Sequence, residues 1–304
     1  MNVAFCVDQH ALIGLSVTLS SLIQNCSDSS RLQIWILCSG VPDYRKNELS
    51  EIFKTEKYSG LYYFIDFNPM ENFALFPSLH GDYTTYGRLL LSDLIDERQI
   101  LYLDSDLVVE LDILDLENFD FKGLPIAAVG GGSFQYALGT NFYTKTLGIA
   151  PEKEYFNAGV LLFNLNQWRQ KQIKEECFNL AKKIGMNLPS HDQSLLNIYC
   201  NGDFAKLPLS FNCSWAAGEK QPTLSEKMIF HFIGAPKPWD PFGSFLHNGH
   251  SKWKKYTRNN KEFRVNYFSI SSILRLWHLR RSYVQCVLKK IEQTYNNQIL
   301  KFET

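Results

Sequence analysis

The stretch ILYLDSDLVVEL, residues 100–111, carries the clearest structural pattern of the chain. A run of four apolar or aromatic residues leads directly into Asp104, Ser105 and Asp106, and apolar residues then resume at Leu107. This pattern predicts a buried strand that ends at a polar edge. Two carboxylates at the end of a buried strand are costly to desolvate unless a cation lies beside them.

Asp104 and Asp106 are therefore candidate metal ligands. Residues i and i+2 of a strand point to the same side, so we expect the two carboxylates to face one ion. Carboxylate oxygens favour a hard divalent cation. The alternative is a solvated turn after the strand, which is the commoner setting of an isolated D-x-D, so the rest of the chain has to decide between them.

Strands and helices alternate on the N-terminal side of this stretch. The predicted strands are residues 2–7, 32–40 and 61–67, and the predicted helices are 11–25, 43–57 and 84–95, the last with Thr84 as a candidate cap. Such alternation predicts an α/β fold, Rossmann-like, with a mainly parallel central sheet. Ligands of these sheets bind beyond the carboxyl ends of the strands, where Asp8 and Asp104 fall. No G-x-G-x-x-G turn follows the first strand, so we expect no dinucleotide cofactor.

On the C-terminal side the pattern continues. Strands are predicted over 125–132, 156–165 and 228–234, and helices over 166–185 and 191–200. The first of these strands ends in glycines 130–132, which either let the backbone approach a ligand or form a flexible turn. The last contains His231, and a histidine in an apolar strand is more often a core residue than a ligand. If the two aspartates bind metal, His231 becomes the third ligand, and two carboxylates with one imidazole suit Mn²⁺.

The chain has 304 residues and a formal net charge of zero, but its charges are unevenly distributed. Residues 251–304 hold 12 Lys/Arg and 3 Asp/Glu, a net charge of +9, so the remainder carries −9. Seven cysteines without a C-x-x-C pair argue against a disulfide framework and a zinc site. The N-terminus lacks a signal-peptide pattern, and no apolar run approaches the roughly 18 residues of a membrane span. We therefore expect reduced thiols and a cytoplasmic location.

The basic C-terminal segment predicts an amphipathic helix that starts near residue 271. Apolar residues including Leu274, Trp277 and Leu288 keep helical spacing, and the Arg and Lys residues fall largely off that stripe. Such a helix favours an anionic membrane surface, so we expect peripheral association with the inner face of the cell membrane. The alternatives are a helix that packs on the domain and a surface patch that binds nucleic acid. We expect no nucleic-acid partner.

Five motifs, in chain order TTYGRL, ILYLDSD, FNAGVLLFNL, HDQSLLN and HFIGAPKPW, resemble those of the retaining glycosyltransferases of family 8. The nearest resemblance is to bacterial galactosyl- and glucosyltransferases that extend lipopolysaccharide or lipooligosaccharide cores, and it covers residues 1 to about 240. It implies a GT-A fold, a UDP-sugar donor, Mn²⁺ or Mg²⁺ as cofactor, and a lipid-linked oligosaccharide acceptor. Together with the basic C-terminal helix, it predicts a GT-A catalytic domain at 1–250 and a basic membrane-association tail at 251–304.

The resemblance also implies roles for individual residues. The metal ligands would be Asp104, Asp106 and His231. Contacts to the nucleotide and donor would come from Cys6, Asp8, His10, Arg88, Asp104, Ser105, Asp106, Asn157, Gly234 and Lys237, the last two at the diphosphate. Asp192 and Gln193 would line the sugar and act in catalysis, and His80 would lie on the acceptor side. We expect front-face attack by the acceptor, because the amide of Gln193 is a poor nucleophile.

The chain departs from the family pattern at glycines 130–132, where close galactosyltransferase relatives carry an aspartate on the sugar. Losing a carboxylate changes which sugar hydroxyls are recognised, so galactose, glucose and an N-acetylhexosamine all remain open as donor sugars. The predicted function is metal-dependent, retaining transfer of a hexose from a UDP-sugar to a glycan acceptor. The alternatives are a catalytically silent sugar-nucleotide-binding protein on the same scaffold and a nucleotidyltransferase.

Overall fold

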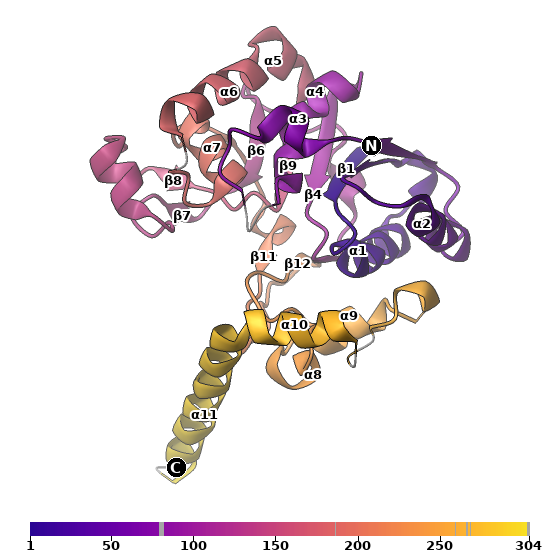
Figure 1. Cartoon of the computed structure of the whole chain (residues 1–304), viewed down its shortest axis with the longest axis vertical. Helices are drawn as coiled ribbons and strands as arrows, with labels where there is room; N and C mark the ends of the chain where they lie inside the picture. Colours follow the sequence, from indigo (N-terminus) through magenta and orange to yellow (C-terminus); the bar gives the residue numbers. More distant parts are fainter. Residues whose placement is uncertain (79–81, 186, 259, 266, 268, 303–304) are drawn as a thin grey trace.

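The computed structural model describes residues 1–78, 82–185, 187–258, 260–265, 267 and 269–302 (Figure 1). A seven-stranded sheet forms its centre. In spatial order the strands are β10 (Ala205–Leu207), β6 (Ile126–Val129), β9 (Val160–Asn164), β4 (Gln99–Leu103), β1 (Asn2–Val7), β2 (Gln33–Cys38) and β3 (Leu61–Asp66). Strand β9 is antiparallel to β4 and β6, and all other neighbours are parallel. The predicted α/β fold with a mainly parallel sheet is confirmed.

Helices cover both faces of this sheet because successive side chains of its central strands are apolar and alternate between the faces. In β1, Val3, Phe5 and Val7 belong to one core cluster, and Ala4 and Cys6 belong to the other. The first cluster includes α1 (Leu12–Asn25) and α2 (Asp43–Thr55). The second includes α3 (Pro69–Phe73), α4 (Leu91–Leu94), α5 (Leu165–Gln170), α6 (Ile173–Ile184) and α7 (His191–Cys200).

A second, three-stranded sheet lies beside the carboxyl end of β4. It consists of β11 (Cys213–Ser214), β12 (Ile229–His231) and β5 (Leu107–Val109), with β12 antiparallel to β5. Two buried hydroxyls of α1 complete the hydrogen bonding of β5: Thr18 Oγ1 accepts from Leu107 N at 3.1 Å, and Ser21 Oγ accepts from Val109 N at 2.9 Å. Because both hydroxyls lie on α1, that helix fixes the position of β5 and thereby of the second sheet.

Two predicted helices differ from the structure. The segment 84–95 forms a 3₁₀ helix, η2 (Thr84–Leu90), followed by α4. Thr84, the predicted cap, is the first residue of η2, and its N–H donates to Asp82 Oδ1. The single helix predicted over 166–185 is two helices, because Gln172 adopts a left-handed conformation with φ +50° between α5 and α6. The predicted end at Gly185 is confirmed, since this residue caps α6 with φ +66°.

Short elements complete the body of the molecule. The remaining strands are β7 (Gly132–Ser133) and β8 (Glu154–Tyr155), which pair with each other. The remaining one-turn helices are η1 (Ser29–Arg31), η3 (Ile113–Leu116), η4 (Phe142–Thr146), η5 (Leu209–Phe211) and η6 (Lys261–Phe263). The strand predicted over 125–132 therefore ends at Val129, and Gly131, with φ +109°, turns the chain between β6 and β7.

The C-terminal part consists of α8 (Gly243–Leu246), α9 (His250–Lys255), α10 (Ile270–His278) and α11 (Arg280–Phe302). Trp253 and Tyr256 pack with Trp215 and Phe230 of the body, whereas α11 projects away from it (Figure 1). The one helix predicted from about 271 is thus two helices, separated at Leu279. None of the helices in the described ranges is long and apolar enough to cross a membrane.

Candidate active site

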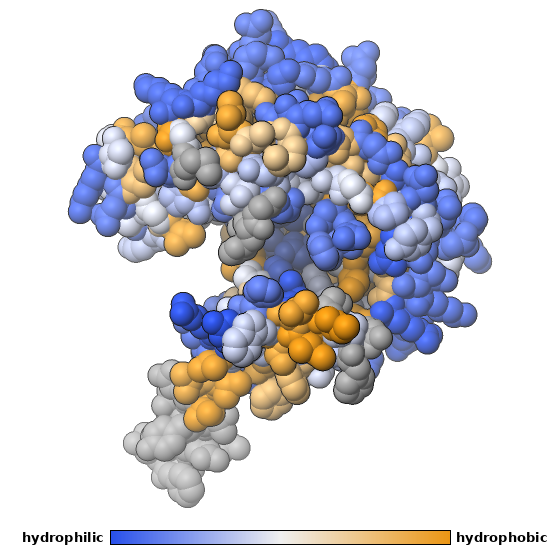
Figure 2. All heavy atoms as spheres, in the orientation of Figure 1, coloured by the Kyte–Doolittle hydropathy of each residue, from blue (hydrophilic) through white to orange (hydrophobic). Residues whose placement is uncertain are grey.

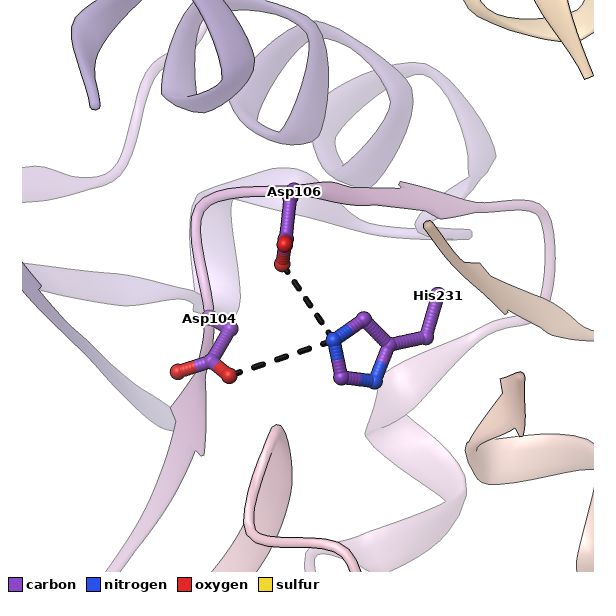
Figure 3. Close-up of side chains that lie close together, drawn as sticks. All are labelled: Asp104, Asp106 and His231. Atoms are coloured by element: carbon purple, nitrogen blue, oxygen red, sulfur yellow. Dashed lines mark ion pairs between the residues drawn. The ribbon is translucent and has the colours of Figure 1, made fainter. Parts of the chain in front are cut away.

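Three side chains with metal-ligand chemistry meet where the chain passes from the central sheet to the second sheet (Figure 3). Asp104 follows β4, Asp106 precedes β5, and His231 ends β12 opposite Leu107. His231 Nε2 lies 3.9 Å from Asp104 Oδ2 and 3.3 Å from Asp106 Oδ1. One ligand atom from each residue lies within 4.8 Å of the others. We predicted that the two carboxylates would face one point because they alternate within one strand. Instead, both lie between β4 and β5, and the bend of the chain there turns them toward the same point.

His231 is oriented by a hydrogen bond on the side away from the carboxylates. Asn212 Nδ2 donates to Asn157 Oδ1 at 3.0 Å, so Asn212 Oδ1 is free to accept from His231 Nδ1 at 2.9 Å. The Nδ1 proton is thereby fixed, and the lone pair of Nε2 points to the aspartates, as in histidines that bind metals. Asn212 was not predicted from the sequence, because its position beside His231 depends on the pairing of β11 with β12.

The donor atoms fit a divalent cation. Asp106 Oδ1 is buried and has no hydrogen-bond partner within the described ranges, while the Nε2 lone pair of His231 faces it. Two acceptors this close repel each other unless a cation or a proton lies between them. Two carboxylates and one imidazole suit Mn²⁺ or a similar ion.

Gly159 leaves the space that the metal ligands need. A Cβ atom at this position would lie 2.2 Å from His231 Cε1 and 3.0 Å from Asp104 Oδ2. The Gly159 carbonyl also accepts from Asp104 N at 2.8 Å, which fixes the start of the bend. Gly159 was not predicted as a site residue, and the glycine within the otherwise apolar run of FNAGVLLFNL was the signal that could have indicated it.

Lys237 supplies positive charge beside Asp106. Its Nζ donates to Asp106 Oδ2 at 2.6 Å and also to the Phe232 carbonyl. Burial raises the pKa of the Asp106 carboxyl, but neighbouring positive charge, that of Lys237 foremost, outweighs it and holds that pKa below its usual range. Burial raises the pKa of Asp104, where Arg88 opposes the rise. The site therefore keeps Asp106 ionised and next to an ammonium group.

Arg88 connects Asp104 to the neighbouring cavity. Its side chain is buried, and Nη2 lies 3.0 Å from Asp104 Oδ1 and 2.9 Å from the Tyr102 hydroxyl. Its Nε lies 3.0 Å from Asp192 Oδ2, although the Nε proton is donated to the Thr85 carbonyl. The guanidinium is therefore engaged by the protein and holds the two carboxylates in place; its expected contact with the donor stays a prediction.

A cavity of about 310 Å³ opens between Asp104 and the N-terminus of α7. Asp192 and Gln193, to which the family resemblance gives a role at the sugar, both line it. Asp192 is buried and accepts from Thr85 Oγ1 at 2.7 Å. Gln193 accepts from Ala158 N at 3.0 Å and donates to the Tyr155 hydroxyl at 3.1 Å. Both ends of the amide are thus occupied, which fixes the side chain against the cavity wall.

The other predicted donor residues lie around this centre. Cys6 is buried at the end of β1, and burial raises the pKa of its thiol, so it is not a thiolate. Asp8 accepts from His10 N at 2.9 Å and from Ala11 N at 3.0 Å, and thereby shapes the turn before α1. The Ser105 carbonyl accepts from Thr18 Oγ1 at 3.0 Å. The Asp8 bonds order the loop at the carboxyl end of β1, and the Thr18 bond orders the segment that follows β4 on the same sheet edge.

The remaining predicted site residues are Asn157, Gly234 and His80. Asn157 Oδ1 accepts from Gly159 N at 2.9 Å as well as from Asn212, so it orders the metal ligands. Gly234 is exposed in the turn after β12, with φ +67°. His80, expected on the acceptor side, lies outside the described residues.

The fold and the geometry can be compared with known proteins. A model of the family described as "Glycosyl transferase family 8" matches residues 2–242 of this chain. This chain belongs to glycosyl transferase family 8. A probable glycosyl transferase of Streptococcus gordonii is 29% identical over 53% of the chain, a match that spans only 22% of that longer protein. A lipopolysaccharide 1,3-galactosyltransferase of Salmonella typhimurium is 25% identical over 80% of the chain and 74% of its own length.

A solved structure agrees with the fold. The galactosyltransferase LgtC in complex with donor and acceptor sugar analogues superposes with a TM-score of 0.69 and 25% identity, covering 84% of this chain and 95% of LgtC. The predictions of family 8 membership and of a GT-A fold are therefore confirmed. The family match ends at residue 242, before α8, so the C-terminal helices lie beyond it.

Proposed function

We propose that this family 8 protein is a metal-dependent, retaining hexosyltransferase that uses a UDP-sugar, with galactose or glucose as the sugar. The observation that carries the proposal is the meeting of Asp104, Asp106 and His231 beside a cavity lined by Asp192 and Gln193. The first group offers ligands for a divalent ion, and the second offers polar groups for a sugar ring. Their joint position at the carboxyl ends of parallel strands is where α/β folds bind nucleotides.

Asp104, Asp106 and His231 would hold Mn²⁺ or Mg²⁺. When bound, such an ion neutralises charge that develops on a diphosphate leaving group. Lys237 would donate hydrogen bonds to the same diphosphate, and the distance of 2.6 Å between its Nζ and Asp106 supports this role. Asp8, His10, Ser105 and Gly234 would contact the nucleotide from the loops on either side.

Asp192 and Gln193 would act on the sugar. The buried carboxylate of Asp192 favours positive charge that develops on the anomeric carbon. Gln193 is a neutral amide whose two ends are both hydrogen-bonded, so it is a poor nucleophile. These two features favour front-face attack by the acceptor hydroxyl, with the departing phosphate taking its proton.

The choice of donor sugar would be made near glycines 130–132. A Cβ at Gly130 would lie 2.8 Å from Glu154 Oε1, and one at Gly132 would lie 2.5 Å from the Tyr155 carbonyl. A side chain at Gly132 would therefore displace β8, which carries Tyr155, the partner of Gln193, whereas one at Gly130 would move only the end of the Glu154 side chain. The absence of a carboxylate here favours neither galactose nor glucose, and it leaves an N-acetylhexosamine open as well.

The acceptor would be a lipopolysaccharide, a lipooligosaccharide or another cell-surface glycan, reached from the inner face of the cell membrane. Exposed apolar residues on α10 and α11 support a peripheral membrane contact (Figure 2). They follow helical spacing on both helices: Ile270, Ile273, Leu274 and Trp277, then Val284, Val287, Leu288 and Ile291. The net charge of +9 over 251–304 complements an anionic lipid surface.

Release of UDP tests the proposed reaction. The full chain is incubated with Mn²⁺ and either UDP-galactose or UDP-glucose, and slow hydrolysis of the donor is measured. We expect Asp106→Asn to lower the rate by about 10²–10³-fold, as losing an electrostatic stabiliser does. Asp203→Asn is the control, because this aspartate lies in the turn between α7 and β10.

The outcomes separate the alternatives. Binding of UDP-sugar and Mn²⁺ without UDP release, with or without acceptor, would identify a silent binding protein. Release of pyrophosphate from a nucleoside triphosphate would identify a nucleotidyltransferase. An unchanged rate in Asp106→Asn would show that the metal ligands are assigned wrongly.

A further inference from the structure

The turn that carries Lys237 is closed by a buried aspartate. Asp240 Oδ2 accepts from Lys237 N at 2.7 Å, and Asp240 N donates to the Lys237 carbonyl at 3.1 Å. The side chain of Asp240 is only 1% exposed. The backbone position of Lys237, and with it the reach of Nζ to Asp106, therefore depends on where this carboxylate is held.

The cation that holds Asp240 comes from α10, outside the family match. Arg275 Nε pairs with Asp240 Oδ1, and Arg275 Nη2 lies 3.1 Å from Asp240 Oδ2. This is a two-pronged guanidinium–carboxylate pair, the geometry that best fixes a carboxylate in one orientation. The turn is also held from α11, because the Tyr283 hydroxyl donates to the Pro241 carbonyl at 2.7 Å.

Loss of the Arg275 guanidinium would leave the Asp240 carboxylate without its counter-charge. A buried carboxylate in that state is strongly unfavourable, so Asp240 would turn toward water. It would then release Lys237 N, and the Lys237 turn would lose the bond that closes it. Displacements of about 1 Å at a reacting centre can cost about 10²-fold in rate.

We propose that Arg275 is a positioning residue for the diphosphate end of the active site, acting on Lys237 through Asp240. The inference rests on the proposed glycosyltransferase function and deepens it. It makes α10 a part of the catalytic unit, in addition to its proposed contact with the membrane. The family motifs end before α10, so this chain completes its active site with a residue from its own C-terminal segment.

Kinetics in solution, without membranes, test the role of Arg275. The full chain carries Arg275→Gln, with Arg98→Gln as the control, because Arg98 is an exposed arginine at the far end of β4. We expect Arg275→Gln to lower kcat for UDP release about tenfold, with a smaller change in KM, since Lys237 acts on the departing diphosphate. Arg275→Lys should recover part of the loss, because one ammonium replaces the charge but not the two-pronged geometry.

Each outcome decides the inference. A kcat of Arg275→Gln within twofold of that of Arg98→Gln overturns it. If Arg275→Gln does not fold, full activity of Arg275→Lys and of Tyr283→Phe would show that the contact serves stability alone. If the unmodified protein releases no UDP from either donor, the proposed function fails. The positioning role is then tested by calorimetric titration with UDP in the presence of Mn²⁺. Equal affinities of Arg275→Gln and Arg98→Gln for UDP would overturn the positioning role.

Discussion

At the scale of single residues, the metal centre depends on a chain of amides behind His231. Asn157 accepts from Asn212, and Asn212 accepts from His231 Nδ1, so the imidazole presents Nε2 to the carboxylates. Such outer partners of a ligating histidine fix its tautomer and ring orientation. The affinity of the site for a divalent ion is therefore set partly by residues that never touch the ion.

Replacing Asn212 by Leu should weaken metal binding while leaving the three ligands in place. We expect the Mn²⁺ concentration for half-maximal UDP release to rise about 10–100-fold, the range found when such outer partners are lost. Calorimetric titration with Mn²⁺ alone measures the same loss without turnover. Asn72→Leu, on the exposed surface of α3, is the control. Equal Mn²⁺ affinity in both variants would contradict the role given to Asn212.

At the scale of elements, α1 and β5 are joined by buried hydroxyls rather than by apolar packing alone. Thr18 Oγ1 accepts from Leu107 N at 3.1 Å and donates to the Leu107 and Ser105 carbonyls, at 2.9 and 3.0 Å. These bonds take the place of a neighbouring strand and hold the bend that contains Asp106. A helix thus orders the metal ligands from the side opposite His231.

Thr18→Val should therefore destabilise the fold although it keeps the shape of the side chain. The variant leaves the buried Leu107 N–H without a partner, which costs about 1–3 kcal/mol. Urea unfolding followed by circular dichroism measures this free energy. Thr223→Val, at an exposed position, serves as the matched change. A loss below about 0.5 kcal/mol would mean that water or another group replaces the hydroxyl.

The end of α8 carries a histidine that should make stability depend on pH. His247 is buried, and burial, followed by the charge of Lys237, lowers its pKa from 6.5 to about 4. Between these values the unfolded chain binds a proton that the folded chain excludes. The contribution of His247 to stability is therefore complete above pH 6.5 and is lost as the pH falls toward 4.

His247→Gln should remove this dependence. Between pH 7 and 4.5 we expect the unfolding free energy of the unmodified protein to fall by about 2 kcal/mol more than that of His247→Gln. His278 is an exposed histidine on α10, so in His278→Gln the unfolding free energy should fall as much as in the unmodified protein. Urea titrations at both pH values measure the difference. Parallel pH profiles for all three proteins would show that His247 is protonated in the folded state.

At the scale of the whole molecule, ion pairs hold a basic C-terminal segment against an acidic body, and one of them joins Arg275 of α10 to Asp240. One face of this helix is apolar and exposed, with Trp277 at 65% and Ile270 at 77% (Figure 2). Arg275 of the same helix turns inward to Asp240. In the proposed membrane contact, the helix would offer its apolar face to lipid while Arg275 remains bound to the active-site turn.

The apolar face of α10 should govern binding to lipid. We expect the full chain with Ile273→Gln and Trp277→Gln to bind vesicles of phosphatidylglycerol and phosphatidylcholine about tenfold more weakly, because less apolar surface is buried. Leu209→Gln, an equally exposed position on the body, should bind normally. Sedimentation with vesicles at low and high salt measures both contributions. Undiminished binding of the double variant would rule out this face as the membrane contact.

The sequence by itself determined the layered α/β architecture and the chemistry of the site. Both depend on local patterns: apolar runs that fill two cores, and carboxylates left at the ends of strands. It also indicated Asp104, Asp106 and His231 as candidate metal ligands, since five motifs together matched one family. It did not place the breaks at Gln172 and Leu279, because a helical pattern continues through them.

Only the tertiary structure decided how these residues act together. The bend between β4 and β5, and the pairing of β5 with β12, turn both aspartates toward His231. Asn212 and Arg275 gain their roles through partners far away in the chain, and local periodicity carries no record of such contacts. The physical reason is that a charge or a lone pair acts over a few ångströms in space, and folding alone determines which residues lie within that distance.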